Sequence, residues 1–181
     1  PLEENAVQMI DELVLQGNCK GIVIEPGYCG EGILMDDECN FEIYKKCEEN
    51  DILMLVSYGG LTAPNQDFMK PIYVDHVAEK FPDLRMVICH AAWPWVTQMC
   101  QIKKKKKNVY ISPDIYMINN PGASDYIAAA NYMLTEKILY GSAYPAVSME
   151  QAANYFKNCG IRKEVLADLM YHNAAKLLGL E

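Results

Sequence analysis

Hydrophobic and polar positions follow two patterns that alternate along the chain. Short apolar runs bounded by turn residues predict buried strands, at 21–25, 52–57, 86–90, 109–112 and 138–141. Apolar residues spaced three or four apart predict helices, at 1–16, 41–50, 72–80, 94–104, 124–134, 149–158, 162–171 and 173–178. Strands that alternate with helices indicate a parallel sheet built from right-handed βαβ units.

The composition is that of a globular protein with a substantial core, because 51% of the residues are hydrophobic and 22% are charged. The net charge of -8 argues against nucleic acid as a partner, since phosphate binding needs a basic face. The sequence has no apolar run of about 18 residues and no signal-peptide pattern. We therefore expect a cytoplasmic protein with no membrane partner.

The seven cysteines are widely spread and include no CxxC pair. Neither a zinc ribbon nor a disulfide framework is therefore indicated, and free thiols are the expectation. Cys29 and Cys39 fall in the loop after the first predicted strand, where a reactive role is the alternative.

Five consecutive lysines, residues 103–107, form the only charge run. They fall at the end of a predicted helix, where cations complement the negative end of the helix dipole. A solvated helix end is therefore the main interpretation, and an acidic partner or an anion is the alternative.

The stretch 85–95, RMVICHAAWPW, carries the first candidate for function. Its predicted strand ends at His90, and parallel α/β architectures present functional side chains at the carboxyl ends of their strands. His90 is therefore the central candidate, as a general acid or base. The alternative is a core histidine whose ring nitrogens are bonded by its neighbours.

Three segments together resemble one family: 75–95, DHVAEKFPDLRMVICHAAWPW; 137–145, KILYGSAYP; and 173–178, NAAKLL. They resemble the helix–strand–His loop, the final strand with its Gly-Ser-Asp-Tyr-Pro turn, and the closing helix of the amidohydrolase-related family. This family is a TIM-like (β/α)8-barrel group of metal-dependent hydrolases and decarboxylases. The resemblance runs over nearly all 181 residues. It implies a hydrolase or decarboxylase acting on a small carboxylate or amide-like substrate.

The resemblance also implies that residues 1–181 are a single α/β domain, equivalent to the fourth to eighth βα units of the barrel. We predict five strands where a closed barrel has eight, and a complete barrel usually takes about 250 residues. The family's first strand supplies a His-x-His metal pair, whereas the only histidines here are His76, His90 and His172. We expect an incomplete barrel, either the C-terminal portion of a longer protein or an open domain.

The carboxyl ends of the predicted strands should share one rim. The resemblance gives His90, Asp114 and Glu25 as the catalytic residues, and Trp93, Tyr58, Ser57 and Tyr144 as the substrate-binding residues. Structural alternatives stand beside these roles: Glu25 as a hydrogen-bonded loop acid, Asp114 as a loop cap, and Trp93 as a packing residue.

The family's metal ligands are only partly matched. The resemblance places Ser57 where the family has a metal-binding His, and Ala143 where it has the Asp that binds metal and activates water. A serine hydroxyl is a poor zinc ligand and alanine offers none. Neighbouring strand residues face opposite sides, which would direct Cys89 away from His90. We therefore expect no metal and no other cofactor in this chain, although the family typically uses zinc or another divalent metal.

These ligand changes keep a second function open, that of a non-catalytic ligand-binding or scaffold relative. In both cases the expected partner is a small molecule. The outer strands, 21–25 and 138–141, would leave apolar edges unpaired. We therefore expect a homo-oligomer, or an N-terminal segment, to cover those edges.

Overall fold

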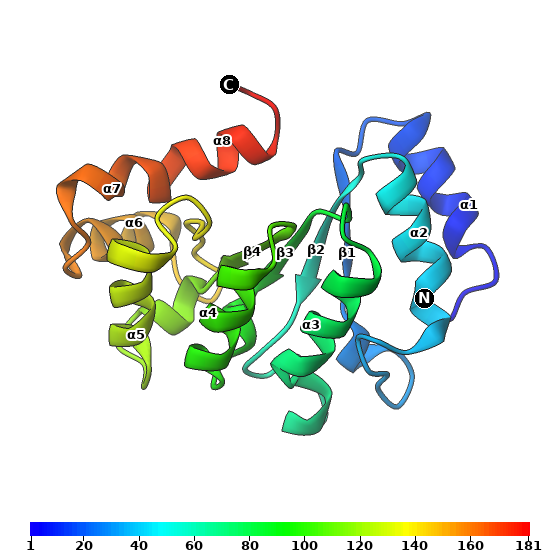
Figure 1. The fold of residues 1–181 in the computed structure, drawn as a ribbon, viewed down its shortest axis with the longest axis horizontal. Coiled ribbons are helices and arrows are strands. Elements are labelled where there is room, and N and C mark those ends of the chain that lie inside the picture. The colour runs from blue at the N-terminus through cyan, green and yellow to red at the C-terminus, as the bar shows by residue number, and fades with distance from the viewer.

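The computed structural model describes residues 1–181 and forms an α/β fold around one parallel sheet (Figure 1). The strands are β1 (Gly21–Ile24), β2 (Leu53–Ser57), β3 (Met86–Cys89) and β4 (Val109–Ser112). They lie in the order β1-β2-β3-β4, and each neighbouring pair is parallel. The predicted parallel sheet is thus confirmed, but it has four strands instead of five.

The stretch 138–141 is the strand that does not form. Ile138 makes an isolated β-bridge with Ile111 of β4, and the amide of Leu139 donates to the carbonyl of Ile111 at 2.9 Å. The next amide, that of Tyr140, donates instead to the carbonyl of Leu169 at 3.0 Å. The chain lies beside β4 as predicted, but it leaves the sheet after one bridge because a C-terminal helix takes its next hydrogen bond.

The helices alternate with the strands and then follow them, as the helical spacing predicted. They are α1 (Ala6–Ile10), α2 (Phe41–Glu49), α3 (Pro71–Lys80), α4 (Val96–Lys105), α5 (Ala123–Ala128), α6 (Met149–Asn158), α7 (Lys163–Ala167) and α8 (Asn173–Leu177). Turns of π-helix extend α1 to Leu15 and α5 to Met133. Pro94 precedes α4 and does not occupy its first turn. None of these helices is long and apolar enough to pass through a bilayer.

The main core lies between one face of the sheet and the helices α2 to α5. Met54, Val56 and Ile88 point to this face and are completely buried. In Figure 1, α3 and α4 lie in front of the sheet, α1 and α2 lie beside β1, and α5 to α7 lie at the other end. Residues buried on both sides explain why β2 and β3 appear as continuous apolar runs in the sequence.

The opposite side of the sheet, here called the inner face, carries Leu53, Val87 and Cys89. Leu53 and Val87 pack with Leu177 of α8 in a small second cluster. Val23 of β1 has the same orientation by register, and it is 64% exposed. The inner face is therefore covered where α8 packs and open at β1.

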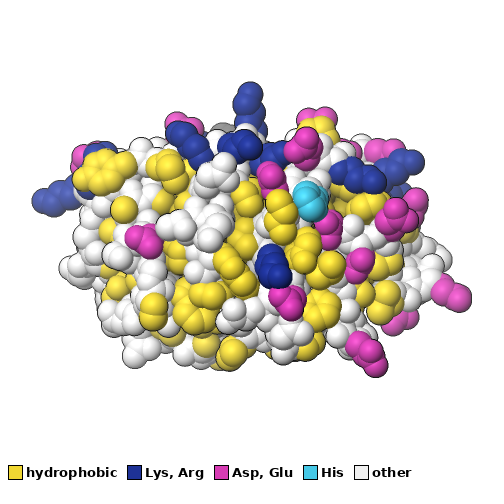
Figure 2. Space-filling model, turned by 60° about the horizontal axis from the view of Figure 1, so that its bottom comes forward, with side chains coloured by type: hydrophobic (Ala, Val, Ile, Leu, Met, Phe, Trp, Pro, Cys, Tyr) yellow, Lys and Arg dark blue, Asp and Glu magenta, His cyan; other side chains and the backbone are white.

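Basic side chains are unevenly distributed over the face shown in Figure 2. The chain has 16 Lys and Arg against 24 Asp and Glu. In the view of Figure 2, the Lys and Arg side chains lie mainly along the upper edge, while hydrophobic side chains occupy much of the centre. A basic cluster can therefore exist on a molecule whose net charge is negative.

Candidate active site

The loop after β3 departs sharply from extended geometry. His90, Ala91 and Ala92 have φ angles of 63°, 46° and 56°, in the left-handed region that costs a non-glycine residue roughly 1–2 kcal/mol. The strand therefore ends at Cys89, one residue earlier than predicted. Ala91 and Ala92 are completely buried, so their small side chains fit a turn that a larger residue would not.

Two glycines after β2 let the neighbouring loop approach this turn. The amide of Gly60 donates to the carbonyl of Trp93 at 2.8 Å, and the amide of Ala92 donates to the carbonyl of Tyr58 at 2.9 Å. A Cβ on Gly60 would lie 1.6 Å from the Tyr116 hydroxyl, and its φ is 64°. A Cβ on Gly59 would lie 2.7 Å from the amide nitrogen of Trp93. Both positions therefore require glycine for close approach.

His90 and Asp114 form the centre of the site. Asp114 Oδ1 lies 3.0 Å from His90 Nδ1, and Asp114 Oδ2 accepts from the His90 amide at 3.0 Å. Asp114 Oδ1 also accepts from the amide of Ile115 at 2.6 Å. The Asp114 side chain is 5% exposed and that of His90 is 20% exposed. Asp114 is thus both a loop cap and a partner of the imidazole.

This arrangement selects one form of the neutral imidazole. The Asp114 carboxylate, which already accepts hydrogen bonds from two backbone amides, can only accept from the imidazole as well. Nδ1 must therefore be the donor, so the proton of neutral His90 belongs on Nδ1. The lone pair is then on Nε2, which no residue of the chain hydrogen-bonds. The alternative of a core histidine bonded at both nitrogens does not describe His90.

An aromatic pair stands beside the imidazole. The rings of Trp93 and Tyr116 stack with centroids 4.8 Å apart and an angle of 15°, and Tyr116 meets the His90 ring edge-on at 5.7 Å. Trp93 Nε1 donates to the carbonyl of Pro121 at 2.8 Å, which fixes the indole. Trp93 was expected here, whereas Tyr116 was missed. The signal for Tyr116 was its place two residues after Asp114, in the same short turn.

Glu25, Ser57 and Cys89 fall in one row across the inner face. Ile24 pairs with Val56, so the next residues, Glu25 and Ser57, face each other, and Ser57 pairs with Cys89. Burial, together with the smaller effect of the negative charges of Asp114 and Glu25, raises the pKa of the Cys89 thiol to about 12. The carboxylates of Asp114 and Glu25 therefore both lie near enough to Cys89 for their charges to affect its thiol.

Strand alternation predicts that Cys89 points away from His90. That argument needs His90 to continue the strand, but its φ of 63° turns it out of the strand. Cys89 stays on the inner face beside the carboxylates. Sequence reasoning therefore missed it as a residue lining the site.

One expected substrate-binding residue, Tyr58, lies in the core and not at the site. Tyr58 is 1% exposed, and its hydroxyl donates to the carbonyl of Lys70 at 2.9 Å. Because it follows Ser57 in alternation, its ring points to the helix-covered face, so its predicted place in the pocket wall is wrong. Tyr144 is 69% exposed, and its amide donates to the Ser142 hydroxyl at 3.2 Å.

The loop after 138–141 packs against the acid of the site. A Cβ on Gly141 would lie 2.6 Å from Ser112 Oγ and 3.2 Å from Asp114 Cβ. Ala143 follows with a φ of 49°. The loop thus reaches Asp114 at Gly141, two residues before Ala143, whose methyl group adds no ligand.

The residues present do not form a metal site by themselves. No group of three or more His, Cys, Asp or Glu side chains is arranged to hold an ion in residues 1–181. Ser57 and Ala143 stand where two further donors would be needed. The side chains present offer acid–base chemistry at this rim, through His90 and Asp114.

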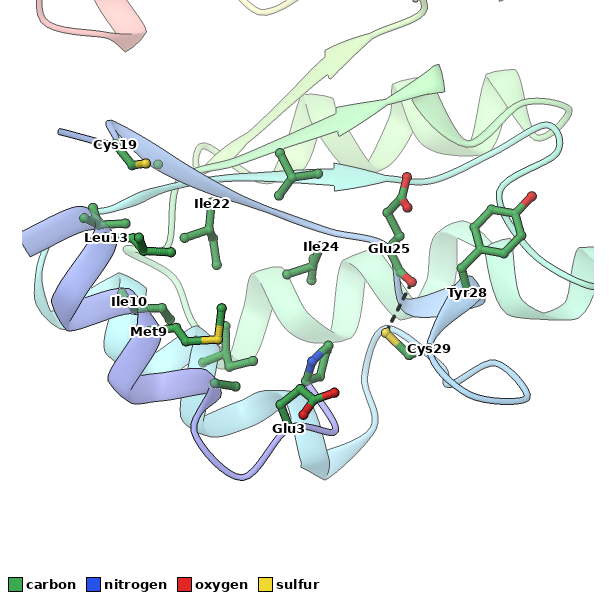
Figure 3. A pocket seen from close by; sticks show the side chains of 16 residues that line it. Glu3, Met9, Ile10, Leu13, Cys19, Ile22, Ile24, Glu25, Tyr28 and Cys29 are labelled. Carbon is green, nitrogen blue, oxygen red and sulfur yellow. Dashed lines mark hydrogen bonds between the residues drawn. The ribbon is translucent and has the colours of Figure 1, made fainter. Parts of the chain in front are cut away.

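A groove of about 520 Å³ runs along β1 and continues to Glu25. Its walls are mostly apolar and come from α1, its π-helical extension and β1, with Met9, Leu13 and Ile22 among them (Figure 3). Cys29 Sγ donates to the carbonyl of Glu25 at 3.4 Å at one end of this groove. Glu25 is exposed, lines the end of this groove, and also acts by its charge on Cys89 of the inner face.

Comparison with known structures places this geometry in a wider group. An uncharacterized TIM-barrel protein from Bordetella bronchiseptica is 32% identical, with a TM-score of 0.88 over 95% of this chain and 60% of that chain. A dihydroxybenzoic acid decarboxylase from Polaromonas sp. JS666, solved with manganese and 2-nitroresorcinol, is 13% identical, with a TM-score of 0.75 over 98% of this chain and 66% of that chain. A 2,6-dihydroxybenzoate decarboxylase from Rhizobium is 12% identical, with a TM-score of 0.74 over 97% of this chain and 67% of that chain.

The chain thus spans about 60% of the length of the Bordetella protein. No curated protein matches it. The high TM-scores show that the four-stranded sheet and its helices have the arrangement of part of a TIM barrel. A model of the amidohydrolase family matches residues 3–180, and the chain therefore belongs to the amidohydrolase family.

Proposed function

We propose that the chain carries the acid–base part of a hydrolase or decarboxylase site for a small carboxylate, with the family's metal set largely lost from these strands. The observation that carries the proposal is the His90–Asp114 pair, joined at 3.0 Å at the carboxyl end of β3 with Nε2 left free. The decarboxylases among the structural neighbours support a carboxylate substrate. The aromatic pair of Trp93 and Tyr116 favours one with a flat ring, which can stack on it.

His90 would move the proton. Nε2 accepts a proton from water for hydrolysis, or delivers one to the carbon that loses carbon dioxide. Asp114 holds Nδ1–H throughout and stabilises the imidazolium that forms when Nε2 is protonated. Glu25, at the open end of the same face, is the second acid and would orient the polar group of the substrate.

The direct test measures the turnover of a panel of aromatic and aliphatic carboxylates. Its readouts are carbon dioxide release and chromatography of the products. His90→Gln should lower turnover by about 10²- to 10⁴-fold, the usual contribution of a general acid or base. The matched control is His76→Gln, because His76 is half exposed and bonds only Asp36, at 2.6 Å. Equal activity of the His90 variant and the wild type would contradict the assignment.

The second candidate function is a non-catalytic ligand-binding relative. It is favoured by Ser57 and Ala143, which stand where the resemblance expects metal-binding residues. Such a protein would be stabilised against unfolding by a carboxylate without converting it. Stabilisation without product in the same panel would decide for this function.

We also propose a reducing, cytoplasmic setting and no nucleic-acid partner. All seven cysteines are free thiols, and five of them are at least partly exposed: Cys19, Cys29, Cys39, Cys89 and Cys159. The net charge of -8 disfavours a phosphate backbone as ligand.

A further inference from the structure

A polar cavity, separate from the apolar groove along β1, lies at the opposite end of the sheet from His90. It has a volume of about 360 Å³ and is lined by the end of α4 and by residues 132–137. Lys107 precedes β4 and Lys137 precedes Ile138, so the cavity is at the amino ends of the strands. Five lysines line the cavity; Lys106 is one of them, and the other four, Lys103, Lys104, Lys107 and Lys137, are here called the lysine cluster.

The lysine cluster has no carboxylate partner. Lys106, in the same run, pairs with Asp75 at 3.4 Å and Glu79 at 2.9 Å, but none of the four cluster lysines forms an ion pair. Glu136 also lines the cavity and makes no ion pair with them. The positive charge of the cluster is therefore not balanced within the chain.

The ammonium groups bond only uncharged oxygens. Lys103 Nζ donates to the carbonyl of Lys106 at 2.8 Å, and Lys104 Nζ to the carbonyl of Met133 at 3.4 Å. Lys137 Nζ donates to the Tyr110 hydroxyl at 2.8 Å. An ammonium carries three N–H donors. Each therefore keeps at least one N–H for a further acceptor.

Burying a charged ammonium group without a carboxylate partner costs free energy. Lys103 is only 3% exposed. Burial, together with the smaller effect of the positive charges of Lys137 and Lys104, lowers its pKa to about 8. The helix dipole explains why cations collect at the end of α4. It does not explain why like charges converge on a cavity in a chain with a net charge of -8.

We propose that the lysine cluster binds a multivalent oxyanion of the phosphate class. A tetrahedral oxyanion offers several acceptor oxygens to separate ammonium donors, and lysine binds phosphate as a point charge. The cavity is lined by Lys103 and Lys104 at the end of α4, by Lys106 and Lys107 just after it, and by residues 132–137, so it does not depend on the open β1 side. The negative charges of such an anion would offset the positive charge of the cluster and reduce the repulsion on Lys103.

Calorimetric titration of inorganic pyrophosphate into the whole chain, at constant ionic strength, tests this proposal. We expect saturation at one site per chain, with parallel broadening of the ³¹P resonance. Lys137→Met and Lys104→Met should each weaken binding by about tenfold, since each removes a charged hydrogen-bond donor. Lys105→Met is the matched control, because Lys105 belongs to the same run and does not line the cavity.

Two results would overturn the proposal. One is the absence of saturable heat with millimolar pyrophosphate and a chain shown to be folded by circular dichroism. The other is equal weakening by Lys105→Met, which would mean binding to diffuse surface charge. If Lys137→Met fails to fold because Tyr110 loses its partner, Lys104→Met and the control decide the outcome.

Discussion

At the scale of single residues, the site depends on backbone positions that L-amino acids rarely adopt. His90 and Asp114 have φ angles of 63° and 43°, and neither is glycine. The bonds from the His90 amide and ring to Asp114 offset this cost, because they form only when both residues turn out of their strands. Such strain persists where the surrounding structure determines it, as at many functional sites.

The sequence identified His90, Asp114, Trp93 and Glu25, because each follows or ends an apolar run. It could not identify the hydrogen bonds between His90 and Asp114, which are 24 residues apart and require left-handed turns in both loops. The left-handed φ of His90 also removes the strand geometry on which the prediction for Cys89 depended. The prediction for Tyr58 failed because alternation after Ser57 directs its ring to the core. There its hydroxyl donates a hydrogen bond to the carbonyl of Lys70.

At the scale of elements, helices and strands were largely predictable and their ends were not. Periodicity determines β2, α2 and α3 because the core face fixes which residues are apolar. The stretch 138–141 has an equally apolar pattern, but a hydrogen bond from Tyr140 to Leu169 draws it from the sheet. A local pattern cannot show that competition between a strand and a distant helix.

The contact between the β2 and β4 loops gives a prediction at this scale. Gly60→Ala should destabilise the fold by about 1–3 kcal/mol, because its Cβ would lie 1.6 Å from the Tyr116 hydroxyl. In the double variant with Tyr116→Ala, the clash disappears, so the two costs should be less than additive. Urea unfolding of the single and double variants measures this coupling. Additive costs would contradict the packing of Tyr116 beneath Gly60.

At the scale of the whole molecule, the sheet is part of a barrel with one open side. The edge of β1 pairs only with β2, and Val23 beside it is 64% exposed. Unpaired strand edges tend to add a further strand or chain. The chain spans about 60% of the Bordetella barrel protein, so the remaining strands of that protein have no counterpart in residues 1–181.

We propose that this chain, studied alone, covers the β1 edge by forming a homo-oligomer. Light scattering coupled to size-exclusion chromatography should give a mass above one chain, and Val23→Lys should shift it to a monomer by placing charge at the edge. Lys20→Gln, which lies just before β1, serves as a control on the same segment. A monomer of the unmodified chain at high concentration would contradict the proposal.

The central claim is that Asp114 holds the imidazole of His90 so that Nε2 is free for proton transfer. The most direct measurement is the ¹⁵N NMR tautomer assignment of His90 in the folded chain, at a pH where its ring is neutral. The account predicts the proton on Nδ1, with Asp114→Asn weakening that preference because the amide can donate to Nδ1. A proton on Nε2 in the unmodified chain would contradict it.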